Sequence, residues 1–599
     1  MNSSDRTVVA FLALLAAGLG LAGVLLGSGW LATLAACGAS PEQVGLLDGF
    51  RLIIGGDETV LATAGGCTPT RAWGVGALTG IIVVLALIGI AAAVAWLRYR
   101  QSDTHFIRTM RYRNGFAHRT ELRRHLGARA MVKAAGTLRP ALLRRQVKAT
   151  DVGWKVGTSR RIETYVSIED SVIVIGPPRS GKGLRFIINA ILDWPGPLVT
   201  TSTRNDNLAA TYHTRQQMGE VIVFDPQRLS GIRSPVRISP ITGCQDPMVA
   251  TGRAAALVTG SGLGQGAQNQ EWAGRATEQL SALLLAAAVG GRGVADLARW
   301  GGNPQAAAEA IDILNVDGPP GWGSSLESVI EGDQKLLGNI WFGVSGACAP
   351  LRIPQIAEAM TPRTGEATFN PDEFIQGTNT LYMIGTKVGA GAAGGYLAAL
   401  LDDVVEQARR RALSMPGSRL DPPLGLVLDE IANIFTWPHL PTVMSDGGGS
   451  GISTLVVLQA RSQAETAWSR AEMDSVFSAA TAKMLLGGSA DVAFLRDMEN
   501  LLGQREEIKT ERSYSEGSTS RQYRHERLAV MSIEEMRRMP AKLGLLAYRR
   551  VRPVLLDLEA WIDRGDARQV KAGKAATESA QREVFAEQRA QASARRRRW

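Results

Sequence analysis

The stretch Gly176-Pro177-Pro178-Arg179-Ser180-Gly181-Lys182-Gly183, written GPPRSGKG, decides the fold. It follows the phosphate-binding P-loop pattern G-x-x-x-x-G-K-[ST] at every position except the last. That position normally carries a hydroxyl for magnesium, and here it is a glycine. The surrounding sequence has to distinguish a nucleotide site from a glycine-rich turn that contains a lysine.

A true P-loop lies between a strand and a helix, and this sequence offers both. The β-rich run 171–175 leads into the motif, and residues 184–192 have the apolar spacing of a helix that ends near Pro195. The loop is therefore expected at a helix N-terminus, where free N–H groups and the helix dipole attract phosphate. Lys182 would reach the β- and γ-phosphates. The predicted nucleotide-binding residues are Gly176, Pro177, Pro178, Arg179, Ser180, Gly181, Lys182, Gly183 and Leu184.

An acidic pair further along the chain is the expected partner of a P-loop. The apolar run 424–428 suits a strand buried on both faces and ends at Asp429 and Glu430. We expect Asp429 to hold magnesium, usually through water, and Glu430 to polarise the attacking water. The run 452–458 ends at Gln459, which either orders that water or senses the γ-phosphate, or is an ordinary polar strand end. The predicted catalytic residues are Lys182, Asp429, Glu430 and Gln459, and Asp429 is the predicted metal ligand.

Further strand patterns occur at 198–201, 221–225 and 482–488, with helical patterns between strands. Such alternation predicts an α/β fold with a parallel sheet and helices on both faces.

Bulk composition limits the remaining choices. The chain has 599 residues, which is too long for a single hydrophobic core, and a formal net charge of +10. A basic balance favours nucleic acid or an anionic membrane as partner. Four cysteines in so long a chain exclude a disulfide scaffold, and no zinc motif is present.

Two long uncharged runs, 7–40 and 72–97, predict two transmembrane helices, with buried core helices as the alternative. The arginines at 98–113 place both termini in the cytoplasm and the intervening loop outside. Cys37 and Cys67 would then lie in an oxidising space, where a disulfide between them is expected.

The flanks of these runs allow other interpretations. Residues 34–37 (LAAC) resemble a lipoprotein cleavage box, although the apolar core is longer than that of a signal peptide. The basic segment 98–161 suits anionic headgroups, a DNA backbone, or a plain solvated helix beside the membrane. Within it, Thr120 is a candidate N-cap for a helix at 121–126.

Several motifs together resemble one protein family. The chain is similar to the type IV secretion coupling proteins, the TraG/TraD-type ATPases of conjugation, over roughly residues 98–552 and most closely to the actinobacterial branch. The segments that carry the resemblance are GPPRSGKG (176–183), LVLDEIANI (426–434), SDGGGSG (445–451), LQARSQ (458–463) and TAKMLLGG (481–488).

The resemblance implies a P-loop RecA-like motor domain with an inserted all-α domain, preceded by two transmembrane helices. Members form hexameric rings with ATP and Mg²⁺ between subunits. They receive relaxase-bound, single-stranded DNA and pass it to the type IV secretion channel proteins. A neighbouring subunit supplies an arginine, for which Arg204 and Arg461 are candidates here. Many members end the P-loop in Gly-Lys-Gly, so Gly183 does not mark a dead site, and a Gly183→Ser change should be tolerated.

The predicted organisation has five parts. These are a membrane anchor at 1–97, a basic juxtamembrane segment at 98–165, a motor domain at 166–246 and 360–560, an inserted all-α domain at 247–359, and a basic tail at 561–599.

Near the C-terminus, residues 506–530 suggest a hairpin or a mobile loop, and 545–548 is the expected last strand. The tail is expected to bind DNA or a partner, or to be a charged, partly helical, loosely ordered terminus. Within the inserted domain, Trp272, Trp300, Trp322 and Trp341 either stack on bases or pack between helices.

The leading functional hypothesis is a multi-pass cytoplasmic-membrane ATPase that delivers relaxase–DNA to the transfer channel. The alternatives are an FtsK-like DNA pump, a nucleotide-binding substrate receptor without turnover, and an ATPase that secretes protein effectors only.

Overall fold

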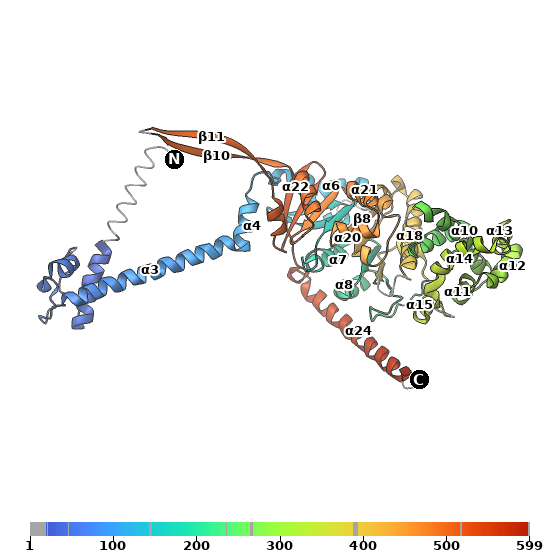
Figure 1. The fold of residues 1–599 in the computed structure, drawn as a ribbon, viewed down its shortest axis with the longest axis horizontal. Helices are drawn as coiled ribbons and strands as arrows, with labels where there is room; N and C mark the ends of the chain where they lie inside the picture. The colour runs from blue at the N-terminus through green and yellow to red at the C-terminus, as the bar shows by residue number, and fades with distance from the viewer. Residues whose placement is uncertain are drawn as a thin grey trace. The chain divides into compact units, whose positions relative to one another are not determined.

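A computed structural model describes residues 20–596 except 21, 46, 143–145, 235, 264–266, 364, 387–392 and 516–517. The chain divides into two compact units, Met1–Met110 and Arg111–Trp599, which are described separately (Figure 1).

The first unit contains a 31-residue helix, α3 (Arg71–Gln101), about 45 Å long at 1.5 Å per residue. Its apolar stretch is fully exposed, and in the described part of the chain it is the one helix long and apolar enough to cross a membrane. The described portion of the first predicted span forms a shorter apolar helix, Ala22–Cys37, and residues 7–19 of that span lie outside the described residues.

Short helical turns connect these two helices. They are α2 (Asp48–Phe50), η1 (Arg51–Gly55) and η2 (Glu58–Leu61). A small core of Ala32, Leu52 and Leu61 holds them together, and α4 (Asp103–Arg111) follows α3.

Cys37 and Cys67 form a disulfide across the loop, as expected, with 6.0 Å between their Cα atoms. The bond occupies the Cys37 thiol that lipidation would need, which contradicts the lipoprotein alternative. The other two cysteines, Cys244 and Cys348, are free and buried.

The second unit is built on an eleven-stranded sheet of order β2-β1-β13-β12-β9-β3-β8-β7-β4-β6-β5. The seven strands from β9 to β5 are mutually parallel, as predicted. The four at the other edge are antiparallel, so the sheet is mixed and the purely parallel expectation was wrong. The parallel strands are β3 (Val172–Ile175), β4 (Leu198–Ser202), β5 (Val221–Phe224), β6 (Thr380–Ile384), β7 (Leu424–Asp429), β8 (Ile452–Leu458) and β9 (Ala482–Leu486).

Tight turns explain the antiparallel edge. β1 (Gly153–Ser159) and β2 (Ile162–Ser167) are joined by Arg160 and Arg161, both with positive φ, in a two-residue turn that suits a hairpin. These strands lie in a segment that the sequence marked only as basic. β12 (Leu543–Tyr548) turns equally tightly into β13 (Val551–Asp557), so the expected last strand is followed by another.

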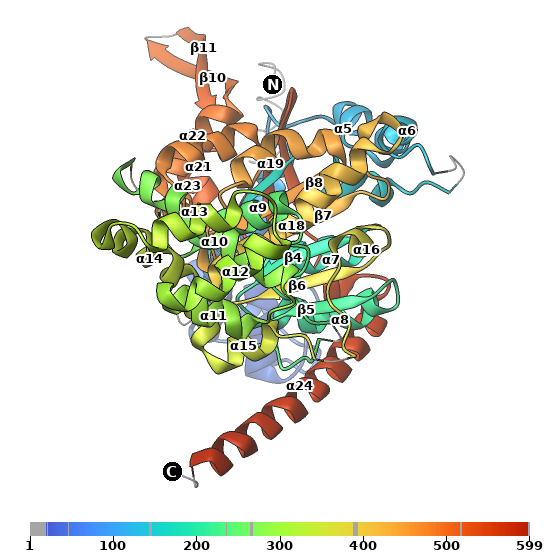
Figure 2. The same cartoon turned by 90° about the vertical axis from the view of Figure 1, so that its right-hand side faces the viewer.

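Residues 247–360 contain only helices in their described part, and these gather in a lobe of the second unit (Figures 1 and 2). The helices of the lobe are α9 (Pro247–Gly260), α10 (Ala267–Val289), α11 (Val294–Gly302), η5 (Pro304–Ala307), α12 (Ala308–Asp317), α13 (Trp322–Ile330), α14 (Gln334–Cys348), η6 (Ala349–Arg352) and α15 (Pro354–Met360). Trp300 and Trp341 are buried in this lobe, which favours the packing interpretation for them.

Before the sheet, α5 (Arg119–His125) starts after His118, so Thr120 is not its N-cap as expected. α6 (Ala128–Leu138) follows it. The short helix α16 (Pro371–Ile375) comes just before β6 in the chain. The longer helix α18 (Gly394–Leu413) lies between β6 and β7.

The C-terminal region is more ordered than expected. β10 (Gln504–Ser515) and β11 (Ser518–Ala529) form a separate two-stranded ribbon, in agreement with the predicted hairpin. The tail forms one helix, α24 (Ala567–Arg596), that packs along α8 (Asp206–Gln216). Val570 is buried there, and the Gln581 side chain donates to the carbonyl of Ser230, so the tail is not a loosely ordered terminus.

Candidate nucleotide-binding site

The P-loop connects β3 to a helix that begins at Gly183, with η4 (Gly183–Ile187) continuing into α7 (Ile188–Asp193). The Gly176 N–H donates to the Leu458 carbonyl at 2.9 Å, which ties the start of the loop to the neighbouring strand β8. Gly181 has φ +83°, a conformation that only glycine adopts without strain. The strand–loop–helix context therefore exists as predicted.

Sheet order brings the four predicted catalytic residues together. β3, β8 and β7 are consecutive parallel strands, so their carboxyl ends lie at one edge. Lys182 follows β3, Gln459 follows β8, and Asp429 and Glu430 end β7. The Lys182 ammonium lies 2.6 Å from Glu430 Oε1 and 3.7 Å from Asp429 Oδ1.

Glu430 is held by three side chains from three different strand ends. Its Oε1 also accepts from Gln459 Nε2 at 2.7 Å, and its Oε2 accepts from the Thr203 hydroxyl. Burial alone would raise the pKa of Glu430, but the hydrogen bonds from Lys182, Thr203 and Gln459 outweigh it and lower the pKa. The carboxylate is thus fixed in place and ionised at neutral pH.

Asp429 is more deeply buried, with 5% of the residue exposed. Its Oδ2 accepts from Asn207 Nδ2 at 3.1 Å, whereas its Oδ1 is buried and accepts no hydrogen bond. Burial raises the pKa of Asp429 to about 7, against the opposing effect of Lys182. A buried carboxylate oxygen without a donor suits a cation or its bound water.

The site suits Mg²⁺ that is bound together with a nucleotide better than a metal ion held by protein side chains alone. In the described residues no group of three or more His, Cys, Asp or Glu side chains could hold a metal alone. Mg²⁺ is commonly bound by one or two carboxylates together with substrate phosphates. The buried Ser180 hydroxyl in the P-loop also has no hydrogen-bond partner.

The other predicted residues are placed differently. Arg179 is exposed, with φ +65°. Arg461 is held within the subunit by Glu465 at 3.0 Å, Asp497 at 2.9 Å and Asp474. Its guanidinium is thus engaged by acids of its own chain. Arg204 is exposed and lies 3.4 Å from Asp206.

The sequence reasoning missed Thr203 and Asn207, which contact the two acidic side chains. Both lie just after β4, the strand next to β7 in the sheet. Their position just after a predicted strand could have identified them, because polar residues that follow the strands of a parallel sheet meet at the same edge.

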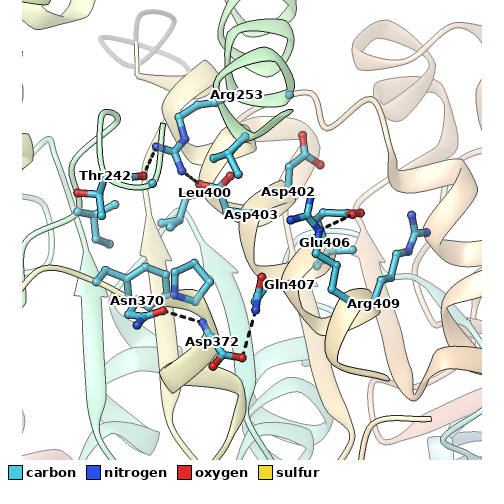
Figure 3. Close-up of a pocket in the computed structure, with 18 of the residues that line it drawn as sticks. Thr242, Arg253, Asn370, Asp372, Leu400, Asp402, Asp403, Glu406, Gln407 and Arg409 are labelled. Atoms are coloured by element: carbon cyan, nitrogen blue, oxygen red, sulfur yellow. Dashed lines mark hydrogen bonds and ion pairs between the residues drawn. The ribbon is translucent and has the colours of Figure 1, made fainter. Parts of the chain in front are cut away.

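A separate cavity of about 640 Å³ lies where α9 meets α18 and α16 (Figure 3). It shares no residue with the P-loop or the acidic pair. On its wall the Arg253 guanidinium pairs with Asp403 at 2.5 Å and donates to the Thr242 carbonyl at 2.6 Å. This cavity marks the joint between the helical lobe and the sheet.

The parallel part of the sheet brings three features to one edge: a P-loop, an acidic strand end, and a polar strand end between them. This arrangement defines a nucleotide-binding protein with a RecA-like fold. Two family models match the sequence. "Type IV secretory system Conjugative DNA transfer" matches residues 120–287, and "TraM recognition site of TraD and TraG" matches residues 423–541. Over these two stretches the chain is similar to the type IV secretion coupling proteins.

Solved structures agree in fold. The bacterial conjugative coupling protein TrwB, in an unbound form, matches with a TM-score of 0.53 and 17% identity, over 68% of this chain and 88% of that chain. TrwB in complex with ADP and Mg²⁺ matches with a TM-score of 0.51 and 18% identity, over 68% and 89%. No significant match was found among curated proteins.

Proposed function

We propose that this protein is a membrane-anchored ATPase that couples DNA to a conjugative type IV secretion channel. The observation that carries the proposal is the meeting of Lys182 with Asp429 and Glu430 at the edge of the sheet, within 2.6 to 3.7 Å. Similarity to the two family models supplies the biological setting.

ATP with Mg²⁺ is the nucleotide that the site supports. Structures of TrwB hold an ATP analogue, and ADP with Mg²⁺. Residues Gly176–Leu184 would surround the phosphates, with Lys182 as their cation. Asp429 would hold the metal, which supplies positive charge to the phosphates.

The surrounding side chains prepare Glu430 for proton transfer. Its lowered pKa keeps the carboxylate able to accept a hydrogen bond from water, and Gln459 and Thr203 fix its direction. Gln459, at the end of the strand between the P-loop and the acidic pair, is placed to contact the same water.

Membrane anchoring uses two spans, with both termini in the cytoplasm. The exposed apolar surface of α3 and the apolar helix Ala22–Cys37 support this arrangement, and so does the disulfide in the loop between them. A homo-hexamer, relaxase-bound single-stranded DNA and the channel proteins are the partners that the family suggests.

The test is ATP turnover by the full chain in lipid, with and without single- and double-stranded DNA. Wild-type turnover should rise with DNA, and Lys182→Ala should abolish it. Lys335→Ala, which removes an exposed lysine of α14, should behave as wild type. Nucleotide binding without turnover would favour the receptor alternative, and absence of binding would refute the nucleotide site.

A further inference from the structure

The unusual last position of the P-loop has a structural counterpart on another helix. Gly183 offers no hydroxyl, but the side chain of Asn207 lies beside it, in the first turn of α8. A Cβ built on Gly183 would lie 3.2 Å from Asn207 Oδ1. Asn207 is 5% exposed, so the rest of the fold fixes its position.

We propose that Asn207 replaces the missing P-loop hydroxyl, with its amide oxygen directed to the magnesium site and its amide nitrogen orienting Asp429. The proposal rests on the proposed nucleotide site and adds a positioning residue to it. No P-loop pattern predicts this role, because Asn207 lies 24 residues beyond Gly183, after a different strand.

Hydrogen bonding determines which way the amide faces. Asn207 Nδ2 donates to Asp429 Oδ2 at 3.1 Å, so the NH₂ group faces that carboxyl group. The amide oxygen then faces the opposite way, toward Gly183. Asp429 Oδ1 accepts no hydrogen bond and has the Lys182 ammonium 3.7 Å away. The amide oxygen of Asn207 and this carboxylate oxygen, from two different elements, therefore lie beside the end of the P-loop.

The replacement exchanges one neutral oxygen ligand for another. An amide oxygen, like a hydroxyl, is a neutral oxygen ligand that Mg²⁺ or its bound water accepts. The exchange therefore leaves the charge of the site unchanged. The 3.2 Å spacing also means that a side chain at position 183 would crowd Asn207. The small residue at 183 thus leaves room for the Asn207 amide. A serine hydroxyl at 183 is expected to replace the amide oxygen only when Asn207 is replaced by a smaller residue.

The alternative is that Asn207 is a structural residue that merely satisfies a buried carboxylate. In that case Asn207→Ala would weaken the fold and nucleotide binding with or without metal. A hydroxyl at position 183 would then repair nothing.

Binding of a fluorescent ATP analogue to the full chain in lipid separates these cases, measured across a Mg²⁺ titration and in EDTA. Asn207→Ala should weaken apparent Mg²⁺ affinity about 10- to 100-fold, as loss of groups around a metal ligand does, and leave affinity in EDTA unchanged. Gly183→Ser in the Asn207→Ala background should restore most of that loss. Asn205→Ala is the matched control, because Asn205 starts the same helix but donates to the Leu229 carbonyl.

Two results would overturn the proposal alone: Asn207→Ala binding Mg²⁺–nucleotide as wild type does, or a double variant no better than Asn207→Ala. An equal loss with Mg²⁺ and with EDTA would also refute it in favour of the structural role. If the wild-type chain binds no nucleotide at all, the proposed function fails and this inference fails with it.

Discussion

Replacing Arg253 with methionine should loosen the joint between the helical lobe and the sheet. Arg253 is 7% exposed, and its guanidinium pairs with Asp403 at 2.5 Å (Figure 3). It also donates to the carbonyls of Pro240 and Thr242 at 2.7 and 2.6 Å. Methionine keeps the apolar length of the side chain but leaves Asp403, whose side chain is 20% exposed and lines the cavity, without a cation.

The expected loss of stability is about 3–5 kcal/mol, the usual cost of removing one partner of a buried ion pair. Asp403→Leu alone should cost a similar amount, since it leaves Arg253 as the uncompensated charge. The double variant removes both charges. It takes the Arg253 donor from the carbonyls of Pro240 and Thr242 and from the Cys244 sulfur, although the Pro240 carbonyl still accepts from the Cys244 thiol. Losing the two carbonyl hydrogen bonds should cost about 1 kcal/mol each, so the double loss should be near 2 kcal/mol.

Urea unfolding of the full chain in detergent, followed by tryptophan fluorescence, would measure all four proteins. Arg253→Lys is the matched control, because it keeps the charge and loses only the forked geometry. The loss in Arg253→Met should shrink as the pH is lowered, because burial raises the pKa of Asp403 and protonation removes its uncompensated charge. Additive single losses, with a double variant near 6–10 kcal/mol, would refute the ion-pair reasoning.

Three further predictions concern other parts of the chain. Arg179→Gly should raise stability by up to about 1 kcal/mol, because φ +65° strains any residue with a Cβ. An unchanged melting temperature would contradict this. The hydrogen bond to Asp402 raises the pKa of His439, so its stabilising effect is complete below the ordinary pKa and fades as pH rises through the raised value. His439→Gln should therefore lower the melting temperature more at about pH 6 than at about pH 8, and an equal drop at both would argue against a charged His439. Cys67→Ser opens a bond with Cys37 that spans 30 residues, which should remove about 3–4 kcal/mol from the loop and speed its proteolysis. Cleavage that is insensitive to reductant in the wild type would count against that bond.

Local sequence was enough to predict those elements whose pattern lies in consecutive residues of the chain. The P-loop lies between β3 and a helix as predicted, because strand, glycine turn and helix are consecutive residues. The apolar runs that became β7 and β8 are buried on both faces and were recognisable for that reason. The acidic pair at the end of β7 could be expected at the same edge, since parallel strands share their carboxyl ends.

Sequence patterns failed where a strand depends on its neighbours. β1 and β2 carry no strong apolar run, and β13 contains Pro553 within an otherwise short strand. β1 pairs with β2 and with β13, and the β1–β13 pair joins Thr158 to Asp557, about 400 positions apart along the chain. Likewise, α24 looked like a charged tail because its buried contacts belong to α8.

The sequence by itself determined the chemistry of this protein: a lysine in a phosphate loop, an acidic strand end and an apolar anchor. These depend on residue types and short spacings, which are properties of the chain before it folds. Only the tertiary structure decided how the chemistry is completed. Thr203 and Asn207 reach the acidic pair because β4 lies next to β7, and Arg461 pairs with three acids of its own chain. Contacts between distant segments arise only when burial of the sheet brings those segments together.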